Sequence, residues 1–353
     1  MVKYKSWVNS VSRWRSETQS RHGFIRLDKN ERVTAFPQDF LAQLMSDITS
    51  DHLTAYPEVE LLYGRLAQEH KVTVDNLMVT AGSDAAIRHC FDLFVNPGGE
   101  VVVLDPTFAM VDVYCQLYGA KKQAIGYDHE LQLDLDRLLG VIGPKTELVI
   151  IANPNSPTGT LIPEADIASI LLRAARFQVP VLIDEAYYGF CKQTAVPILK
   201  EHENLIISRT FSKAYGLAGL RVGYLLAQTE IAQLLYRFRP MYEINSIGIL
   251  AAMRLLDQPQ VAENYLAETE EGRKYLLEFA EGKGLVFQDT QTNFIYIDFG
   301  DKKQAVMNEC SKAGILIRGG LSIEGFETYL RISLGPVVAM QTLVETLRRV
   351  VAM

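Results

Sequence analysis

The pattern of apolar and polar positions predicts alternating strands and helices through the first two thirds of the chain. Short, continuous apolar runs are typical of strands buried on both faces, as in a mostly parallel sheet covered by helices. These runs are Leu77–Thr80, Val101–Leu104, Leu148–Ile151, Val181–Ile183, Leu205–Ile207 and Val222–Leu226. Apolar residues at helical spacing separate several of them, so residues 36–245 are predicted to form a large three-layer α/β/α domain.

The pattern changes after about residue 245 and predicts a second, smaller domain over residues 246–353. Long helical patterns come first, then alternating strand patterns, then a last helix; they lie at Ile247–Leu256, Val261–Glu281, Asn293–Phe299, Ile315–Arg318, Thr328–Ser333 and Val337–Val351. This order is typical of an α+β domain. The polar residues 1–35 are predicted to form an arm that packs on the small domain and on a binding site there.

Composition narrows the class of protein. The chain has 353 residues, 48% apolar and 22% charged, which is an ordinary balance for a soluble globular protein. The net charge is −7 and no run of lysine or arginine occurs, so we expect no nucleic-acid partner. The N-terminus lacks a secretory signal, no apolar stretch is long enough for a membrane span, and the four cysteines are predicted to be buried thiols. We therefore expect a cytoplasmic protein that binds no membrane.

Motifs for dinucleotides, for nucleotide phosphates and for zinc proteases are missing, and the six histidines show no metal-ligand spacing, so no metal is expected. Polar groups instead follow three of the predicted strands: Asn153–Gly159, Asp184–Tyr187 and Ser208–Lys213, with Gly219–Gly223 just beyond. Ligands of open α/β sheets bind beyond the carboxyl ends of the strands. The sequence therefore predicts a binding site at this edge.

The residue types at this edge suit one cofactor. Lys213 could act as an amine nucleophile that forms a Schiff base, and Asp184 could keep a pyridine nitrogen protonated. Tyr187 could donate a hydrogen bond to a phenolic oxygen. Lys213 alone would usually be a solvated lysine, and Asp184 alone would usually be a helix-capping or loop carboxylate. Their common position favours pyridoxal 5'-phosphate (PLP).

A phosphate could be held close by. Arg221 and Ser212 offer side-chain donors, and a helix predicted to begin with Ser83 or Asp84 at its cap offers backbone N–H groups. The alternative for Arg221 is a surface ion pair, which contributes little stability.

Three stretches carry a resemblance to a known family. They are Asp184-Glu-Ala-Tyr187, Tyr56-Pro-Glu58 and Arg209-Thr-Phe-Ser-Lys-Ala-Tyr-Gly-Leu-Ala-Gly-Leu-Arg-Val-Gly-Tyr224. From about residue 25 onward the chain resembles the fold-type-I PLP-dependent aminotransferases of class I/II, most closely the histidinol-phosphate aminotransferase branch. The resemblance implies an enzyme that moves an amino group from an amino acid or amino-phosphate donor to a 2-oxo acid.

The resemblance also implies roles for individual residues. Lys213 matches the Schiff-base lysine that moves protons, Asp184 the partner of the pyridine nitrogen, and Tyr187 the donor to the ring oxygen. The phosphate cup and its surroundings match Gly82, Ser83, Asp84, Thr210, Ser212 and Arg221. Phe108 sits where the family stacks an aromatic ring on the cofactor, with a core phenylalanine as the alternative. Tyr56 matches a residue that reaches the cofactor phosphate of a neighbouring subunit, which implies a homodimer with shared active sites.

Substrate contacts are expected from the same resemblance. Arg331 matches the arginine that binds the anionic group of the substrate, with a structural ion pair as the alternative. Arg318 matches a second arginine that assists with a phosphate, and Asn30 falls in the segment that lines the substrate site.

The chain departs from the family pattern at three places. One is the stretch Gly-Gly-Leu-Ser after Arg318, where the branch commonly has a run that contains proline. The residue before Pro157 is usually an asparagine that bonds the ring oxygen; here it is Ser156, so either Asn155 or Ser156 takes that role, and Asn155 is our first choice. The branch usually continues Asn-Glu-Asn-Pro, where this chain has Asn30-Glu-Arg32-Val. Arg32 either adds charge for an acidic or phosphorylated amino acid or faces solvent. The sequence therefore leaves the substrate open.

Two other functions are compatible with the sequence. A decarboxylase resembling threonine-phosphate decarboxylase would use the same cofactor, and it would release carbon dioxide without needing a 2-oxo acid. A non-catalytic regulatory or binding protein of this fold is the other alternative; the presence of Lys213 argues against it.

Overall fold

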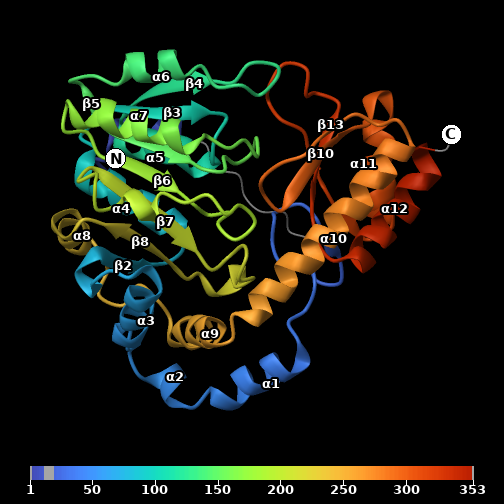
Figure 1. Ribbon diagram of the computed structural model, residues 1–353, viewed down its shortest axis with the longest axis horizontal. Coiled ribbons are helices and arrows are strands. Elements are labelled where there is room, and N and C mark those ends of the chain that lie inside the picture. The colour runs from blue at the N-terminus through green and yellow to red at the C-terminus, as the bar shows by residue number, and fades with distance from the viewer. Residues whose placement is uncertain (1, 12–19, 352–353) are drawn as a thin grey trace.

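The computed structural model describes residues 2–11 and 20–351, and it divides into two lobes (Figure 1). The large lobe contains a seven-stranded sheet in the order β2-β8-β7-β6-β5-β3-β4. The strands are β2 (Leu77–Thr80), β3 (Glu100–Asp105), β4 (Lys121–Gly126), β5 (Thr146–Ala152), β6 (Val181–Asp184), β7 (Leu205–Thr210) and β8 (Gly223–Ala227). Only β8 runs antiparallel to its neighbours, so the prediction of a mostly parallel sheet is confirmed.

Side chains alternate between the two faces of this sheet, and helices cover both faces. Val101 and Val103 pack with helices α4 (Ser83–Phe94), α5 (Ala109–Tyr118) and α8 (Thr229–Tyr236). Val102 and Leu104 belong to the opposite core. Its helices are α1 (Gln38–Asp47), α3 (Glu60–His70), α6 (Leu135–Val141), α7 (Glu164–Ala175) and α9 (Ser246–Asp257), and the short α2 (Asp51–Thr54) lies beside α9. The large lobe therefore has the predicted three layers.

The small lobe combines helices with antiparallel strands. Its main sheet has the order β12-β13-β10-β9, and α10 and α11 both pack on α12. The elements are α10 (Gln260–Gly282), β9 (Phe287–Gln288), β10 (Phe294–Asp298), α11 (Lys303–Lys312), β11 (Ile315–Leu316), β12 (Arg318–Gly319), β13 (Tyr329–Ser333) and α12 (Val337–Val351). The boundary differs from our prediction at α9, because the apolar face of this helix, with Ile249 and Leu255, packs in the core of the large lobe.

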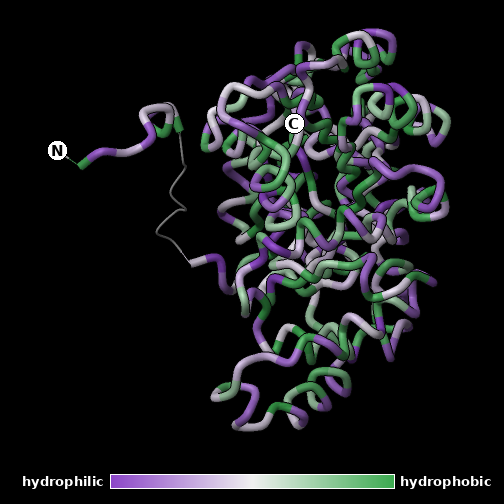
Figure 2. Tube along the Cα trace, turned by 90° about the vertical axis from the view of Figure 1, so that its left-hand side faces the viewer, coloured by the Kyte–Doolittle hydropathy of each residue, from purple (hydrophilic) through white to green (hydrophobic). Residues whose placement is uncertain are grey.

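The N-terminal segment contacts both lobes. Strand β1 (Ile25–Arg26) pairs in parallel with β11 of the small lobe, as an arm on that lobe should. The first described residues differ from the prediction: the 3-10 helix Ser6–Ser10 packs on α5, and the Trp7 indole donates a hydrogen bond of 3.0 Å to the carbonyl of Leu117 in the large lobe. In Figure 2 this short helix lies at the side of the main body.

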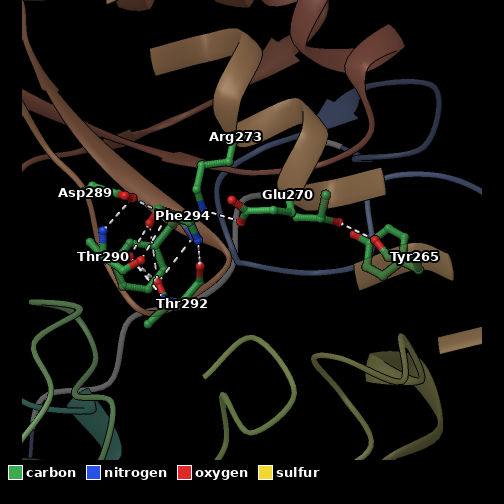
Figure 3. Close-up of polar contacts among 8 residues, drawn as sticks. Tyr265, Glu270, Arg273, Asp289, Thr290, Thr292 and Phe294 are labelled. Atoms are coloured by element: carbon green, nitrogen blue, oxygen red, sulfur yellow. Dashed lines mark hydrogen bonds and ion pairs between the residues drawn. The ribbon is translucent and has the colours of Figure 1, made fainter. Parts of the chain in front are cut away.

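A buried arginine on α10 holds the small-lobe loop between β9 and β10, which contacts the large lobe. Arg273 ion-pairs with Asp289 and Glu270 and donates hydrogen bonds to the carbonyls of Thr290 and Thr292 (Figure 3). The loop so held touches the large lobe, because a Cβ atom added to Gly159 would lie 2.4 Å from Thr290. This contact places the small lobe against the carboxyl ends of the large-lobe strands.

Candidate active site

A cavity of about 560 Å³ lies where the two lobes meet, at the carboxyl ends of β5, β6 and β7. Residues from both lobes and from the N-terminal segment line it. From the predicted set these are Asn30, Ser83, Asp84, Phe108, Ser156, Asp184, Tyr187, Thr210, Ser212, Lys213, Arg221, Arg318 and Arg331. The structure thus brings together most of the predicted residues, although they come from distant parts of the sequence.

The side chain of Lys213 lines this cavity. Its Nζ donates hydrogen bonds of 3.1 Å to the backbone carbonyls of Lys29 and Asn30, and it lies 5.7 Å from the ring centre of Tyr187. No carboxylate of the described residues lies within ion-pairing distance of this amine. The amine is therefore held only by neutral acceptors, which a reacting group could replace.

Asp184 ends strand β6 with a buried carboxyl group. The residue is 4% exposed, and its Oδ1 accepts a hydrogen bond of 2.8 Å from the Ser208 hydroxyl. Burial raises the pKa of this carboxyl to about 6, with Glu185 and Asp84 adding to the increase and Ser208 opposing it. A buried carboxylate with one neutral donor favours a cationic partner, and a protonated pyridine nitrogen meets that requirement.

Tyr187 is oriented by a network from the small lobe and the N-terminal segment. The side-chain Nδ2 of Asn30 donates a hydrogen bond of 2.8 Å to the Tyr187 hydroxyl. Its Oδ1 accepts a hydrogen bond of 2.8 Å from the Ser333 hydroxyl. Asn30 is 2% exposed and adopts a left-handed backbone conformation with φ of 57°. Asn30 therefore lies at the cavity as predicted, but its side chain is engaged with Tyr187 and Ser333.

The N-terminus of α4 and Arg221 form a cradle for an anion. The helix begins at Ser83, and its capping residue is Gly82 with φ of 84°, so the predicted cap at Ser83 or Asp84 is wrong by one or two positions. The positive φ favours glycine here, and the absence of a Cβ atom also lets Nη2 of Arg221 approach, since a Cβ atom would lie 2.7 Å from it. Arg221 donates a hydrogen bond of 3.1 Å from Nη1 to the Ser212 hydroxyl. Free backbone N–H groups and a guanidinium suit a phosphate.

Two further residues of the predicted phosphate cup, Thr210 and Asp84, are held by hydrogen bonds beside this cradle. The Thr210 hydroxyl donates a hydrogen bond of 2.9 Å to the Ser212 hydroxyl, and the Asp84 carboxylate accepts one of 3.0 Å from Tyr114.

Phe108 is half-buried; it lines the cavity and also packs against the large-lobe core. Its position is therefore compatible both with a ring that stacks on the cofactor and with a core phenylalanine.

The structure does not bring Asn155 to the cavity. The residue is 0% exposed, and its amide donates hydrogen bonds to Pro106 and Thr158 and accepts one from Thr107. Ser156 lines the cavity instead, with its Oγ 3.5 Å from the Tyr187 hydroxyl. Spacing within the loop could not reveal this, because either residue can point inward depending on the turn.

Cationic side chains gather at the small-lobe end of the cavity. Arg331, on β13, is 7% exposed and donates a hydrogen bond of 2.8 Å from Nη2 to the carbonyl of Asp28, while its buried Nε has no partner among the described residues. Arg318, on β12, is exposed at the rim. Lys29 also lines the cavity, and sequence reasoning missed it although its neighbour Asn30 was identified. The small-lobe end of the cavity is suited to an anion.

Tyr56 does not reach this cavity. Its ring stacks on Tyr242 with centres 4.0 Å apart, and the residue is 72% exposed.

Comparisons with known proteins agree with this geometry. The family model "Aminotransferase class I and II" matches residues 33–350. The chain is 32% identical over 336 residues to a histidinol-phosphate aminotransferase of Moorella thermoacetica, covering 93% of this chain and 86% of that protein. It is 33% identical over 326 residues to one from a Thermoanaerobacter species, covering 92% of each.

Solved structures show the same fold. A histidinol-phosphate aminotransferase of Sinorhizobium meliloti in complex with PLP superimposes with a TM-score of 0.88 at 25% identity, covering 100% of this chain and 98% of that one. An aspartate aminotransferase of Thermus thermophilus with maleate gives a TM-score of 0.76 at 18% identity, covering 93% and 91%. The chain belongs to the class I and II aminotransferases. It is an enzyme of this family, a PLP-dependent transaminase of fold type I.

Proposed function

We propose that this transaminase acts on an amino donor with an anionic far end, that histidinol phosphate is the first donor to test, and that a 2-oxo acid is the acceptor. The observation that carries the proposal is that one cavity is lined by Lys213 and by three other cationic side chains. These are Arg331, Arg318 and Lys29. Oxyanions are the ligands that such arginines bind in bidentate fashion. The relatives named above are histidinol-phosphate aminotransferases, which adds support.

The residues present fit PLP. We assign Asp184 to the pyridine nitrogen, Tyr187 and Ser156 to the ring oxygen, and the α4 N-terminus with Arg221 to the phosphate. When bound, PLP supplies an electron sink that stabilises negative charge at the α-carbon of the substrate. Ser156 replaces our first choice, Asn155, because it is the one that lines the cavity.

Lys213 is the general base and acid in this proposal. With PLP bound, its Nζ would take the proton from the substrate α-carbon and would deliver it again on the same face, and the carbonyls of Lys29 and Asn30 would hold the amine. Asn30 positions the Tyr187 hydroxyl. Arg331 fixes the anionic group of the substrate, so that the α-carbon lies within reach of Lys213.

We also propose a homodimer in which Tyr56 completes the active site of the partner subunit. Tyr56 is exposed on the segment after α2, stacked on Tyr242, and Met241 beside it is 74% exposed. Both views place α1 and α2 at the lower end of the molecule (Figures 1 and 2).

Among the described residues no helix is long and apolar enough to cross a membrane. The cytoplasm stays our predicted location.

A half-reaction screen tests the donor. The PLP-loaded enzyme is mixed with histidinol phosphate, glutamate, aspartate or an aromatic amino acid, and the change in cofactor absorbance is recorded without acceptor. Histidinol phosphate should convert the cofactor to its amine form at the highest rate per concentration. Faster conversion by glutamate, aspartate or the aromatic amino acid than by histidinol phosphate would contradict the proposal of this donor, and release of carbon dioxide would indicate a decarboxylase.

A further inference from the structure

A second cavity, of about 370 Å³, lies beside the active site. Glu31 and Ala218 line both cavities, so the two are neighbours. The rest of its wall is mostly basic: Arg21, His22, Arg26, Arg32, Gly216 and Gly219. No role in the proposed transamination has been assigned to it.

Two of its arginines are already neutralised. Arg21 pairs with Asp28 at 2.5 Å and with Glu31 at 2.9 Å, and Nε of Arg26 lies 3.2 Å from Glu31. These ion pairs build the wall of the cavity and leave little uncompensated charge there.

Arg32 is different, because it is buried without a counter-ion. The residue is 7% exposed, so it does not face solvent, which was one of our two expectations. Its Nε donates a hydrogen bond of 3.2 Å to the carbonyl of Thr34, but Nη1 is buried without any hydrogen-bond partner. No carboxylate of the described chain lies within 4.0 Å of its guanidinium. Arg32 therefore keeps unused donors next to a cavity.

The surroundings hold this guanidinium in place. It lies over two aromatic rings, 4.4 Å from the centre of Phe36 and 4.0 Å from that of Tyr265. A Cβ atom added to Gly216 would lie 2.7 Å from Cδ of Arg32, so the glycine leaves room for the arginine stem. The rings contact the guanidinium by cation–π interactions and use none of its N–H donors, so the unpartnered Nη1 stays available to an anion.

Arg273 is a buried arginine with a structural role, and its contacts provide a comparison for Arg32. Both Arg273 and Tyr265 lie on α10, and the Arg273 guanidinium contacts two carboxylates and two carbonyls (Figure 3). Arg32 has one carbonyl. Burial lowers the pKa of the Arg32 guanidinium, which Tyr265 and Glu268 only partly oppose, although an arginine still carries its charge at neutral pH. An unpaired buried charge costs stability, so a ligand that supplies the counter-charge should bind there.

We propose that this second cavity is an oxyanion site in which Arg32 binds a phosphate or carboxylate group. The group belongs either to a free anion or to the far end of a substrate that extends past Glu31 and Ala218. The proposal goes beyond the transamination proposed above and does not depend on histidinol phosphate being the donor.

Thermal unfolding of the PLP-loaded full-length enzyme tests it, with inorganic phosphate added at constant ionic strength against chloride. PLP occupies the α4 cradle in this experiment, so that cradle cannot account for the effect. Phosphate near saturation should raise the Tm of the wild type by roughly 2–4 °C. Arg32→Met should lose this shift, and its Tm without phosphate should equal or exceed that of the wild type, because an unpaired buried charge is removed. Arg349→Met, an exposed arginine on α12, is the matched control and should retain the shift.

Three results would overturn the proposal. One is a wild type that phosphate does not stabilise. The second is a shift that Arg331→Met abolishes and Arg32→Met retains, which would place the anion on the active-site arginine. The third is a shift that both Arg32→Met and Arg331→Met retain, which would place the anion outside both cavities. Once the site is established, inhibition kinetics identify the source: phosphate competes with the amino donor if the site takes the substrate, and does not compete if it takes a free anion.

Discussion

The cofactor end and the substrate end of the cavity are built in different ways. At the cofactor end, Asp184 ends β6, and Ser212 and Lys213 follow the end of the neighbouring β7. The Asp184 carboxylate accepts a hydrogen bond from Ser208, the Ser212 hydroxyl accepts one from Arg221, and Lys213 donates to backbone carbonyls. At the substrate end, Arg318 lies exposed on a two-residue strand, and Arg331 has a buried Nε without a partner in the described chain.

This difference separates the groups that carry out the reaction from the groups that recognise a particular substrate. Strand ends in a packed sheet hold catalytic groups to a fixed geometry, which suits a reaction that is the same for every substrate. Short strands and loops can change without disturbing the core, and they supply the groups that recognise different substrates. Substitutions at the cofactor end should therefore reduce the rate, and substitutions at the substrate end should raise KM.

The largest effect is expected from Lys213→Ala. Removal of the amine deletes both the covalent attachment of the cofactor and the proton carrier, so kcat should fall by about 10⁴-fold or more. PLP should still bind through the α4 cradle and Asp184, which absorbance after gel filtration would show. A variant with normal turnover would contradict the assignment of the cofactor end.

Asp184→Asn should reduce kcat by roughly 10²–10³-fold, since a preorganised charge that stabilises the transition state is lost. KM for the donor should change little, because Asp184 lies away from Arg331 and Arg318 at the other end. Steady-state kinetics decide this. A large increase in KM with an unchanged kcat would mean that the two ends are not separate.

Arg331→Met should raise the KM of an anionic donor by roughly 10–100-fold, because a charge-assisted hydrogen bond of about 1.5–3 kcal/mol is lost. The kcat at saturation should stay within a few fold. Arg318→Met, at the exposed rim, should have the same direction and a smaller effect. Equal KM values for anionic and neutral donors in the wild type would show that the substrate end does not select for charge.

The pH dependence of PLP binding should report on Asp184. Burial raises its pKa from 3.8 to about 6 in the protein without cofactor, so the carboxyl takes up a proton as pH falls through about 6 and loses its attraction for a pyridinium. PLP affinity should therefore fall by about tenfold for each pH unit below 6. The phosphate of PLP also titrates near this pH and contributes to the pH dependence of PLP affinity. Asp184→Asn is the control, because it removes the contribution of the Asp184 carboxyl and keeps that of the phosphate.

The same shift has the opposite consequence for the protein without cofactor. Between about pH 4 and 6 the folded state keeps the Asp184 proton that the unfolded state has lost, so this group lowers the free energy of unfolding as pH rises. Denaturant titration at several pH values would show that the free energy of unfolding declines less with rising pH in Asp184→Asn than in the wild type.

Elements with strong patterns were predictable from the sequence, and weakly patterned ones were not. Strand Leu77–Thr80 and helix Val337–Val351 have the predicted bounds, since one is continuously apolar and the other strongly amphipathic. The edge strand Lys121–Gly126 was missed because it begins with two lysines, which an edge position tolerates.

At the site, residue types at strand ends indicated Lys213 and Asp184 correctly as neighbours, because parallel strands end at one edge. The direction of a loop side chain depends on the turn, so Asn155 and Ser156 could not be distinguished. The burial of Arg32 depends on Phe36 and on Tyr265, which lies more than two hundred residues away, and no local pattern reports it.

Borohydride reduction of the PLP-loaded enzyme, followed by peptide mapping, tests the central claim most directly. The reduced cofactor should be attached to the peptide that contains Lys213, in a yield close to one per chain. Lys29 lines the same cavity and is the internal comparison. Attachment to Lys29 or to any other lysine, or no attachment at all, would contradict the account.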